Sequence, residues 1–266
     1  MFQGVRASVA DLGYAAGWSV VKSAPSGLSE RAFRAAADAA TVRNGGGTRQ
    51  LRKNLRRVVG PAVSELRMDQ LVGDALRSYS RYWLETFRLP KLDHRDVVRR
   101  MDANTTGAQH IDAAVESGRG FILALPHIGN WDVSGLWLVD RYRRPFATVA
   151  ERLKPESLYD RFVAYREGLG FEVLPLTGGE RSAASVLTER LKAGGGVGLL
   201  GDRDLSRNGV EVQFFGAAAK MPPGPALLAA TTGAALMPVS MWFTDDGWGQ
   251  RIDPPMPPAR KRPSPS

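Results

Sequence analysis

The chain has 266 residues, 43% of them hydrophobic, which is enough for a large α/β domain with its own core, preceded by a helical extension. It contains no cysteine, which excludes disulfides and thiolate chemistry. With only three histidines we expect no metal site, and we expect no bound cofactor. The excess behind the +9 net charge lies in the first hundred residues, with 18 Lys and Arg against 9 Asp and Glu, whereas residues 101–266 carry 18 of each.

Residues 1–100 are predicted to form a basic helical region. An amphipathic start is followed by helices over 29–41 and 68–89, which are separated by a glycine break at 45–47 and a basic helix. Basic helices with an apolar stripe bind anionic lipid surfaces and sometimes nucleic acid, so we expect this region to associate with a membrane. An ordinary solvated helix face packed on a core is the alternative. The basic helix carries Arg49, Arg52, Lys53, Arg56 and Arg57, interleaved with Leu51, Leu55, Val58 and Val59.

Helices and strands alternate in the rest of the chain. Such alternation is typical of a mostly parallel central sheet with helices on both faces, so we predict an α/β core over 101–250. The longest uncharged run, 221–244, is broken by prolines, and no segment convincingly spans a bilayer. Residues 251–266 are rich in proline and basic residues and are predicted to be a disordered tail. Strands are expected at 121–125, 146–150, 171–175, 196–200, 210–214 and 236–243, and helices at 105–117, 132–141, 155–169, 181–193 and 224–232.

The stretch FILALPHIGNWD holds a histidine directly after a buried strand. Its first five residues are apolar on both faces, and a proline ends them. His127 then lies at the carboxyl end of the strand, Gly129 and Asn130 form a turn, and Asp132 takes the N-cap or first-turn position of the next helix. Histidine can take the proton of an attacking hydroxyl, and a carboxylate on its far nitrogen fixes the tautomer. A histidine that merely caps or bridges two elements is the alternative.

No enzyme nucleophile accompanies this histidine. The chain has no cysteine, and no GxSxG sequence follows a strand. The base is therefore expected to activate a hydroxyl of the substrate itself, in a direct acyl transfer without an acyl-enzyme.

Charged residues follow two other predicted strands. If they gather near the histidine, arginines supply forked donors to phosphate and carboxylates accept from sugar hydroxyls, which favours a phosphorylated or polyol substrate. Salt bridges and helix caps are the alternative. The residues are Glu151, Arg152 and Lys154 after one strand, Asp202, Arg203 and Asp204 after another, and Arg166 on the helix between them.

Several ordered segments resemble a known family over nearly the whole chain to about residue 250. The spacing His, four residues, Asp is the first motif of the lysophospholipid acyltransferase superfamily. Within it, the likeness is greatest to the bacterial lipid A biosynthesis acyltransferase group, and there to the phosphatidylinositol mannoside acyltransferases. The segments are HIGNWDVSG at 127–135, those at 150–176, 201–216 and 221–243, and YWLETFRLP at 82–90.

The resemblance implies an α/β sandwich whose helical N-terminal part associates peripherally with the cytosolic face of the cell inner membrane. It also implies transfer of a palmitoyl group from acyl-CoA, as co-substrate, to the 6-hydroxyl of mannose in a mannosylated inositol phospholipid. His127 matches the general base, Asp132 the residue that orients it, and Asp202 an acidic position that shares the charge relay. Polar residues matched to, or predicted for, substrate binding are Glu151, Arg152, Lys154, Arg166, Arg203, Asp204 and Asn130.

Two other functions stay open at this stage. One keeps the chemistry and changes the acceptor to lipid A or another glycolipid. The other is a non-catalytic basic protein that binds membrane or nucleic acid through residues 43–67, whereas the acyltransferase reading implies no nucleic acid. The C-terminus also departs from the resemblance, because family members generally continue with another helix or two where this chain has its proline-rich tail.

Overall fold

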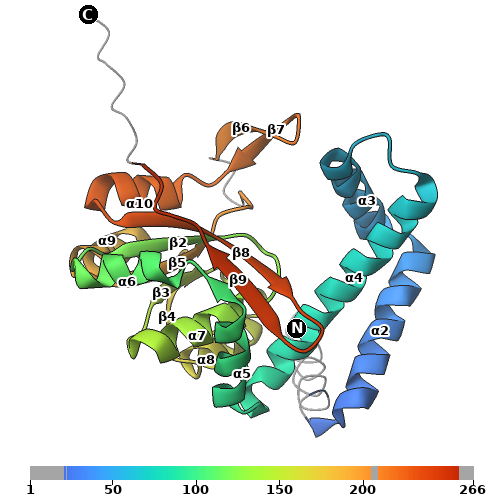
Figure 1. The fold of residues 1–266 in the computed structure, drawn as a ribbon, viewed down its shortest axis with the longest axis horizontal. Coiled ribbons are helices and arrows are strands. Elements are labelled where there is room, and N and C mark those ends of the chain that lie inside the picture. Colours follow the sequence, from blue (N-terminus) through green and yellow to red (C-terminus); the bar gives the residue numbers. More distant parts are fainter. Residues whose placement is uncertain (1–20, 22, 205–208, 258–266) are drawn as a thin grey trace, which may run out of the picture. The chain divides into compact units, whose positions relative to one another are not determined.

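The computed structural model describes residues 21, 23–204 and 209–257, and separates the chain into two compact units (Figure 1). The first unit comprises Met1–Leu92 and Val212–Ala219, and the second comprises Asp93–Glu211 and Lys220–Ser266. The predicted amphipathic start and residues 258–266 of the predicted tail lie outside the described residues. Within the described part of the chain, no helix is long and apolar enough to cross a membrane.

The described part of the first unit before residue 92 is helical, as the sequence predicts. Helix α2 (Ser26–Arg43) packs on α4 (Glu65–Arg88) through the rings of Phe33 and Phe87 and a hydrogen bond of 2.7 Å from Arg77 Nε to Asp38. The basic helix α3 (Gly46–Val59) comes between α2 and α4 in the sequence, and the 3-10 helix η1 (Leu89–Lys91) follows α4. Two glycines of the predicted break belong to the first turn of α3, because Asn44 in the left-handed region already ends α2.

Part of the charge on α3 is used inside the unit. Arg52 lies 2.6 Å from both Glu65 and Asp69 of α4, and Arg56 also pairs with Glu65. Lys53 and Arg57 are exposed. The basic helix is therefore partly a packed face and partly a solvated cationic one.

The second unit is built on a seven-stranded sheet of order β1-β9-β8-β2-β5-β3-β4. Its neighbouring strands run parallel except β8 and β9, which are antiparallel, and this confirms the predicted mostly parallel α/β sheet. Strand β2 lies between β5 and β8, with Phe121 opposite Gly196 and Ala235. The strands are β1 (Thr105–Thr106), β2 (Phe121–Leu125), β3 (Ala147–Ala150), β4 (Glu172–Pro175), β5 (Gly196–Leu200), β8 (Ala235–Phe243) and β9 (Trp248–Ile252).

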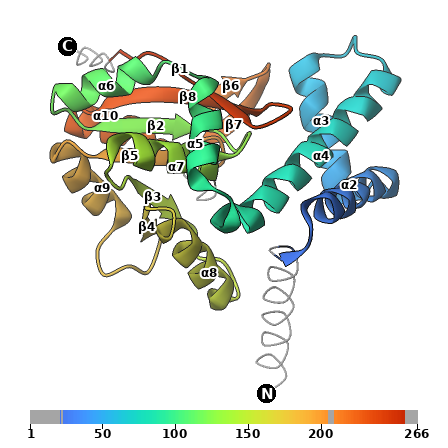
Figure 2. The same ribbon diagram turned by 60° about the horizontal axis from the view of Figure 1, so that its bottom comes forward.

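Helices cover both faces of this sheet (Figure 2). On one face, α9 (Ala183–Lys192) and α10 (Gly224–Thr232) bury Leu187 and Leu228 against Ile122 and Val197 of the central strands. On the other face, α6 (Ala108–Glu116) and α7 (Trp131–Tyr142) cover β2, where the rings of Phe121 and Tyr142 lie 6.3 Å apart. Helix α5 (His94–Ala103) packs on α7, and α8 (Glu156–Glu167) precedes β4.

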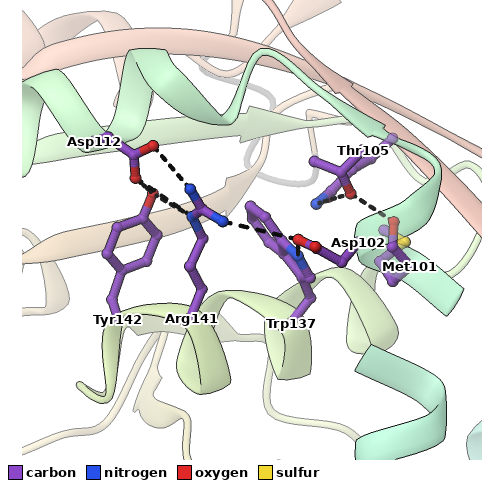
Figure 3. A network of polar contacts seen from close by, with 8 residues as sticks. Met101, Asp102, Thr105, Asp112, Trp137, Arg141 and Tyr142 are labelled. Atoms are coloured by element: carbon purple, nitrogen blue, oxygen red, sulfur yellow. Dashed lines mark hydrogen bonds and ion pairs between the residues drawn. The ribbon is translucent and has the colours of Figure 1, made fainter. Parts of the chain in front are cut away.

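A polar network fixes the C-terminal end of α7 (Figure 3). Arg141 and Tyr142 both bond Asp112 of α6, at 2.8 and 2.6 Å, and the Trp137 indole donates to Asp102 of α5 at 2.8 Å. Burial alone would raise the pKa of Asp112, but the hydrogen bonds from Arg141 and Tyr142 outweigh it and hold that pKa below its usual value. Burial and the bond to Asp112 raise the pKa of Tyr142, so its hydroxyl stays a donor.

The structure moves two of the predicted boundaries. The one at residue 100 falls inside α5, which belongs to the second unit because it packs on α7. The tail predicted from 251 begins too early, because β9 runs to Ile252 and the amides of Asp253 and Met256 donate to β8. Proline removes its own donor, but the residues between prolines keep theirs.

Three strands were not predicted. Strand β1 takes the first two residues of the helix expected at 105–117, and that helix, α6, begins only at Ala108. Strand β9 was not predicted because its centre holds a polar glutamine, Gln250. This residue is buried, and its Oε1 accepts a hydrogen bond of 2.6 Å from the Ser134 hydroxyl of α7. Strand β7 (Ala217–Met221) escaped because it is rich in alanine, which has little strand preference. It pairs with β6 (Val210–Phe214) in a separate two-stranded sheet.

Candidate active site

Three neighbouring parallel strands of the second unit end at one edge of the sheet. Leu125 of β2 pairs with Leu200 of β5, and β3 pairs with β5 on the other side. Because the strands are parallel, the residues that follow them gather at the same edge, where open α/β sheets bind ligands. These residues include His127, Asp202 and Glu151, as the sequence predicts.

The imidazole of His127 is held by Asp202. Its Nδ1 lies 2.6 Å from Asp202 Oδ1, and its backbone N–H donates to Asp202 Oδ2 at 3.0 Å. Burial alone would raise the pKa of Asp202, but the hydrogen bonds from the ring and the backbone of His127 outweigh it and hold that pKa below its usual value. An ionised Asp202 accepts the proton of Nδ1, so the lone pair of neutral His127 is on Nε2. The side chain of His127 is 38% exposed, which leaves the ring accessible.

The loop that carries His127 is supported by β8. This strand continues past the end of β2, and a Cβ added at Gly129 would lie 2.8 Å from the carbonyl carbon of Met241. Gly129 also has a φ of +58°, so the turn needs glycine both for its conformation and for this close approach. The sequence-predicted turn at Gly129 and Asn130 is confirmed.

Asn130 is the N-cap of α7. Its side-chain oxygen accepts from the amide of Val133 at 3.2 Å, and the residue is buried. This placement differs from the expected substrate contact, because the side chain lies in the core and caps a helix.

Asp132 lies in the first turn of α7, as predicted, but faces a different partner. Its side chain is fully buried and accepts from Arg166 Nε of α8 at 3.0 Å. The Arg166 guanidinium carbon lies 4.4 Å from the centre of the Trp131 ring, and this side chain is 14% exposed. The orienting position on Nδ1 of His127 is thus taken by Asp202 rather than Asp132. The Asp132–Arg166 pair instead ties the start of α7 to α8.

The other predicted binding residues are spread along the edge. Glu151, Arg152 and Lys154 are exposed after β3, and Arg203 is exposed beside Asp202. Arg152 lies 3.5 Å from Glu156 and 5.9 Å from the Tyr159 ring, so it is partly engaged locally.

Asp204 differs from this group, because its carboxylate accepts from the amide of Gly209 at 2.8 Å. It therefore links the loop after β5 to Gly209, the residue before β6.

Two exposed apolar residues near the loop of His127 were not predicted. Ile128 and Trp242 are about half exposed, and the backbone of Trp242 lies against the Gly129 turn. In β8, Met241 is buried and Trp242 is not. The alternation of inward and outward residues along the strand could therefore have indicated that Trp242 is exposed. The indole of Trp242 lies over Gly249 of β9, where an added Cβ would come within 2.5 Å of the ring.

The model of the bacterial lipid A biosynthesis acyltransferase family matches residues 6–261. The chain belongs to this family. The phosphatidylinositol mannoside acyltransferase of Mycolicibacterium smegmatis (strain ATCC 700084 / mc(2)155) is 55% identical over 246 residues, which cover 92% of this chain and 79% of that protein. The protein of the same name from Mycobacterium tuberculosis (strain ATCC 25618 / H37Rv) is 51% identical over 250 residues, 94% of this chain and 78% of that one. The resemblance seen in the sequence is confirmed.

In a member of an acyltransferase family, the His127–Asp202 pair has a definite chemical use. A neutral imidazole with one nitrogen bonded to a carboxylate can accept a proton at the other, and the carboxylate stabilises the imidazolium that forms. The roles of the site residues stay predictions, and the geometry favours Asp202 as the partner of the base.

Proposed function

We propose that this protein transfers a long-chain acyl group, palmitoyl, from acyl-CoA to the 6-hydroxyl of mannose in phosphatidylinositol mannosides. The observation that carries the reaction type is the bond between His127 Nδ1 and Asp202 in a family of acyltransferases. The names of the relatives at 55% and 51% identity support the acceptor.

The proposed reaction uses His127 as a general base. Nε2 takes the proton of the mannose hydroxyl as its oxygen attacks the thioester carbonyl carbon. The tetrahedral intermediate then expels the CoA sulfur, which receives the proton back from the imidazolium. Asp202 stabilises the imidazolium throughout and keeps the ring in one orientation. No covalent acyl-enzyme forms.

The two sides of His127 suit different parts of the substrates. Ile128 and Trp242 offer apolar surface on the β8 side, where we place the acyl chain. Arg152, Lys154 and Arg203 offer exposed cations on the β3 and β5 side, where we place the phosphate and sugar groups.

We further propose that the protein acts peripherally at the cytosolic face of the inner membrane. The first unit supports this, because its two segments carry 15 Lys and Arg against 7 Asp and Glu. An anionic inositol-lipid surface attracts such a unit.

The experiment measures CoA release from palmitoyl-CoA in the presence of a panel of acceptors. The chain has no cysteine, so a thiol reagent reports only the released CoA. We expect release with mono- or dimannosylated phosphatidylinositol and none with phosphatidylinositol itself, and mass spectrometry of the product to locate the new ester on the mannose 6-hydroxyl.

The family match alone also suits a different glycolipid acceptor. Faster release with a lipid A precursor than with the mannosides would overturn the proposed acceptor and keep the chemistry. Vesicle binding without any acceptor-dependent release would overturn the acyltransferase proposal itself.

A further inference from the structure

The β6–β7 hairpin has a turn that its own sequence does not favour. Strand β6 ends at Phe214 and β7 begins at Ala217, so the turn consists of Phe215 and Gly216. Their φ angles are +49° and +72°, the pattern of a turn that prefers Asn-Gly or Asp-Gly. A bulky residue with positive φ is an outlier. Backbone geometry therefore does not explain the phenylalanine at position 215.

The apolar side chains at this turn are exposed. Phe214 and Phe215 are 49% and 52% exposed, and their ring centres lie 4.6 Å apart in an edge-to-face arrangement. Val210, at the start of β6, is exposed as well. The hairpin forms its own two-stranded sheet, so these rings do not serve the core of the seven-stranded one.

The turn belongs to the cationic part of the molecule. Val212–Ala219 group with Met1–Leu92, and these segments carry 15 Lys and Arg against 7 Asp and Glu, whereas the rest of the chain has 21 against 20. The same unit exposes Lys53 and Arg57 on α3. Cationic side chains together with exposed aromatic ones are the combination that holds peripheral proteins on anionic bilayers.

We propose that the β6–β7 hairpin inserts the rings of Phe214 and Phe215 into the interfacial layer of an anionic lipid bilayer. Two half-exposed rings are too small for a stable protein interface, which buries roughly 800 Å² per partner, whereas at a bilayer apolar insertion adds to the attraction between charges. The inference rests on the proposed function only in that the acceptor is a membrane lipid. It adds the segment that meets the bilayer.

A single labelled cysteine tests the insertion directly. Because the chain has no cysteine, Phe215→Cys accepts one environment-sensitive fluorophore, and Glu116→Cys on α6 is the matched control. With vesicles of phosphatidylinositol and phosphatidylcholine, the label at 215 should brighten, shift to the blue and be quenched by spin-labelled acyl chains, and the label at 116 should not. An unchanged signal at 215 on protein that sediments with the vesicles would overturn the proposal.

Substitutions at the turn separate apolar insertion from folding. Phe215→Asn suits the turn better than phenylalanine, so the Phe214→Thr/Phe215→Asn variant should fold and yet partition roughly tenfold less onto the vesicles. Phe215→Trp keeps an interfacial aromatic ring and should partition normally. Equal partitioning of all three proteins would contradict the insertion.

The rate with a water-soluble short-chain acceptor distinguishes this result from a failure of the proposed function. That rate should be equal in the native chain and the double variant. A chain with no transfer in either form would refute the enzyme proposal and leave the partition result valid.

Discussion

Two hydrogen-bonded pairs of side chains begin in the same short stretch of chain, and their surroundings differ. The side chains of His127 and Asp202 are both about one-third exposed. Asp132 is fully buried, and Arg166 is largely buried beside the ring of Trp131. The first, exposed pair is accessible to a substrate, whereas in the second, sealed pair even Arg166 is only 14% exposed. The two residues of the first motif, His127 and Asp132, thus belong to different pairs and do not bind each other.

Burial decides what each pair contributes. Even a fully charged pair adds little to stability when it is exposed, about 0–1 kcal/mol, because water screens it. A buried pair is costly to break, because removal of one member leaves the other charged in a low-dielectric core. Changes at the exposed pair should therefore appear in turnover, and changes at the sealed pair in the free energy of unfolding.

The largest effect is expected at the base. His127→Ala should lower turnover roughly 10²- to 10⁴-fold, because the proton acceptor is lost. The melting temperature should stay unchanged, because the substitution removes few packing contacts. Steady-state CoA release and thermal unfolding measure the two quantities. His110→Ala, on α6 and outside the site, should keep the native rate. If His127→Ala retains most of the rate, the base assignment is wrong.

At the sealed pair we expect loss of stability instead. Asp132→Ala should lower the free energy of unfolding by about 3–5 kcal/mol, because Arg166 is left buried beside Trp131 without its carboxylate. Urea denaturation measures the change. The double variant Asp132→Asn/Arg166→Met removes both charges and should recover part of the loss. A change below about 1 kcal/mol would contradict the contrast between the pairs.

A subtler change at the exposed pair tests the tautomer. In Asp202→Asn the amide can donate to Nδ1, which places the ring proton on Nε2 and removes the lone pair that attacks the hydroxyl proton. Turnover should fall roughly 10²-fold while KM changes little. Asp202→Glu keeps a carboxylate and should retain more of the rate. Equal rates in the two variants would argue against an orienting role.

The smallest effect is expected at the C-terminal end of α7, where Asp112 is only partly buried. Asp112→Asn should lower the free energy of unfolding by about 1–2 kcal/mol at neutral pH, through weaker bonds to Arg141 and Tyr142. The folded pKa of Asp112 is depressed, so its contribution is complete above the unfolded pKa of about 3.9 and is lost as pH falls through the folded pKa.

Urea titrations from neutral pH down to acid measure this dependence. Asp140→Asn is the control, because its ion pair with Arg143 is highly exposed and should contribute less. A difference between wild type and Asp112→Asn that grows as the pH falls would refute the assignment.

The layout of the core was predictable because its central strands are continuous apolar runs. Strands β2 and β5 and helix α10 have the expected bounds, and His127 stands where the end of β2 implied. The partner of the histidine was not predictable from local spacing, because Asp202 reaches it across the β2–β5 pairing from 75 residues away. Strand β9 was missed because its Gln250 is buried through hydrogen bonds that no periodicity records.

The seven-stranded sheet also stops abruptly at both of its outer margins. On one margin β1 is two residues long, and on the other β4 has four residues and ends at Pro175, which has no amide hydrogen. Another copy of the chain therefore finds little template on which to add a strand. If the protein gathers on a lipid surface as proposed, these short edge strands protect crowded molecules from pairing edge to edge into aggregates.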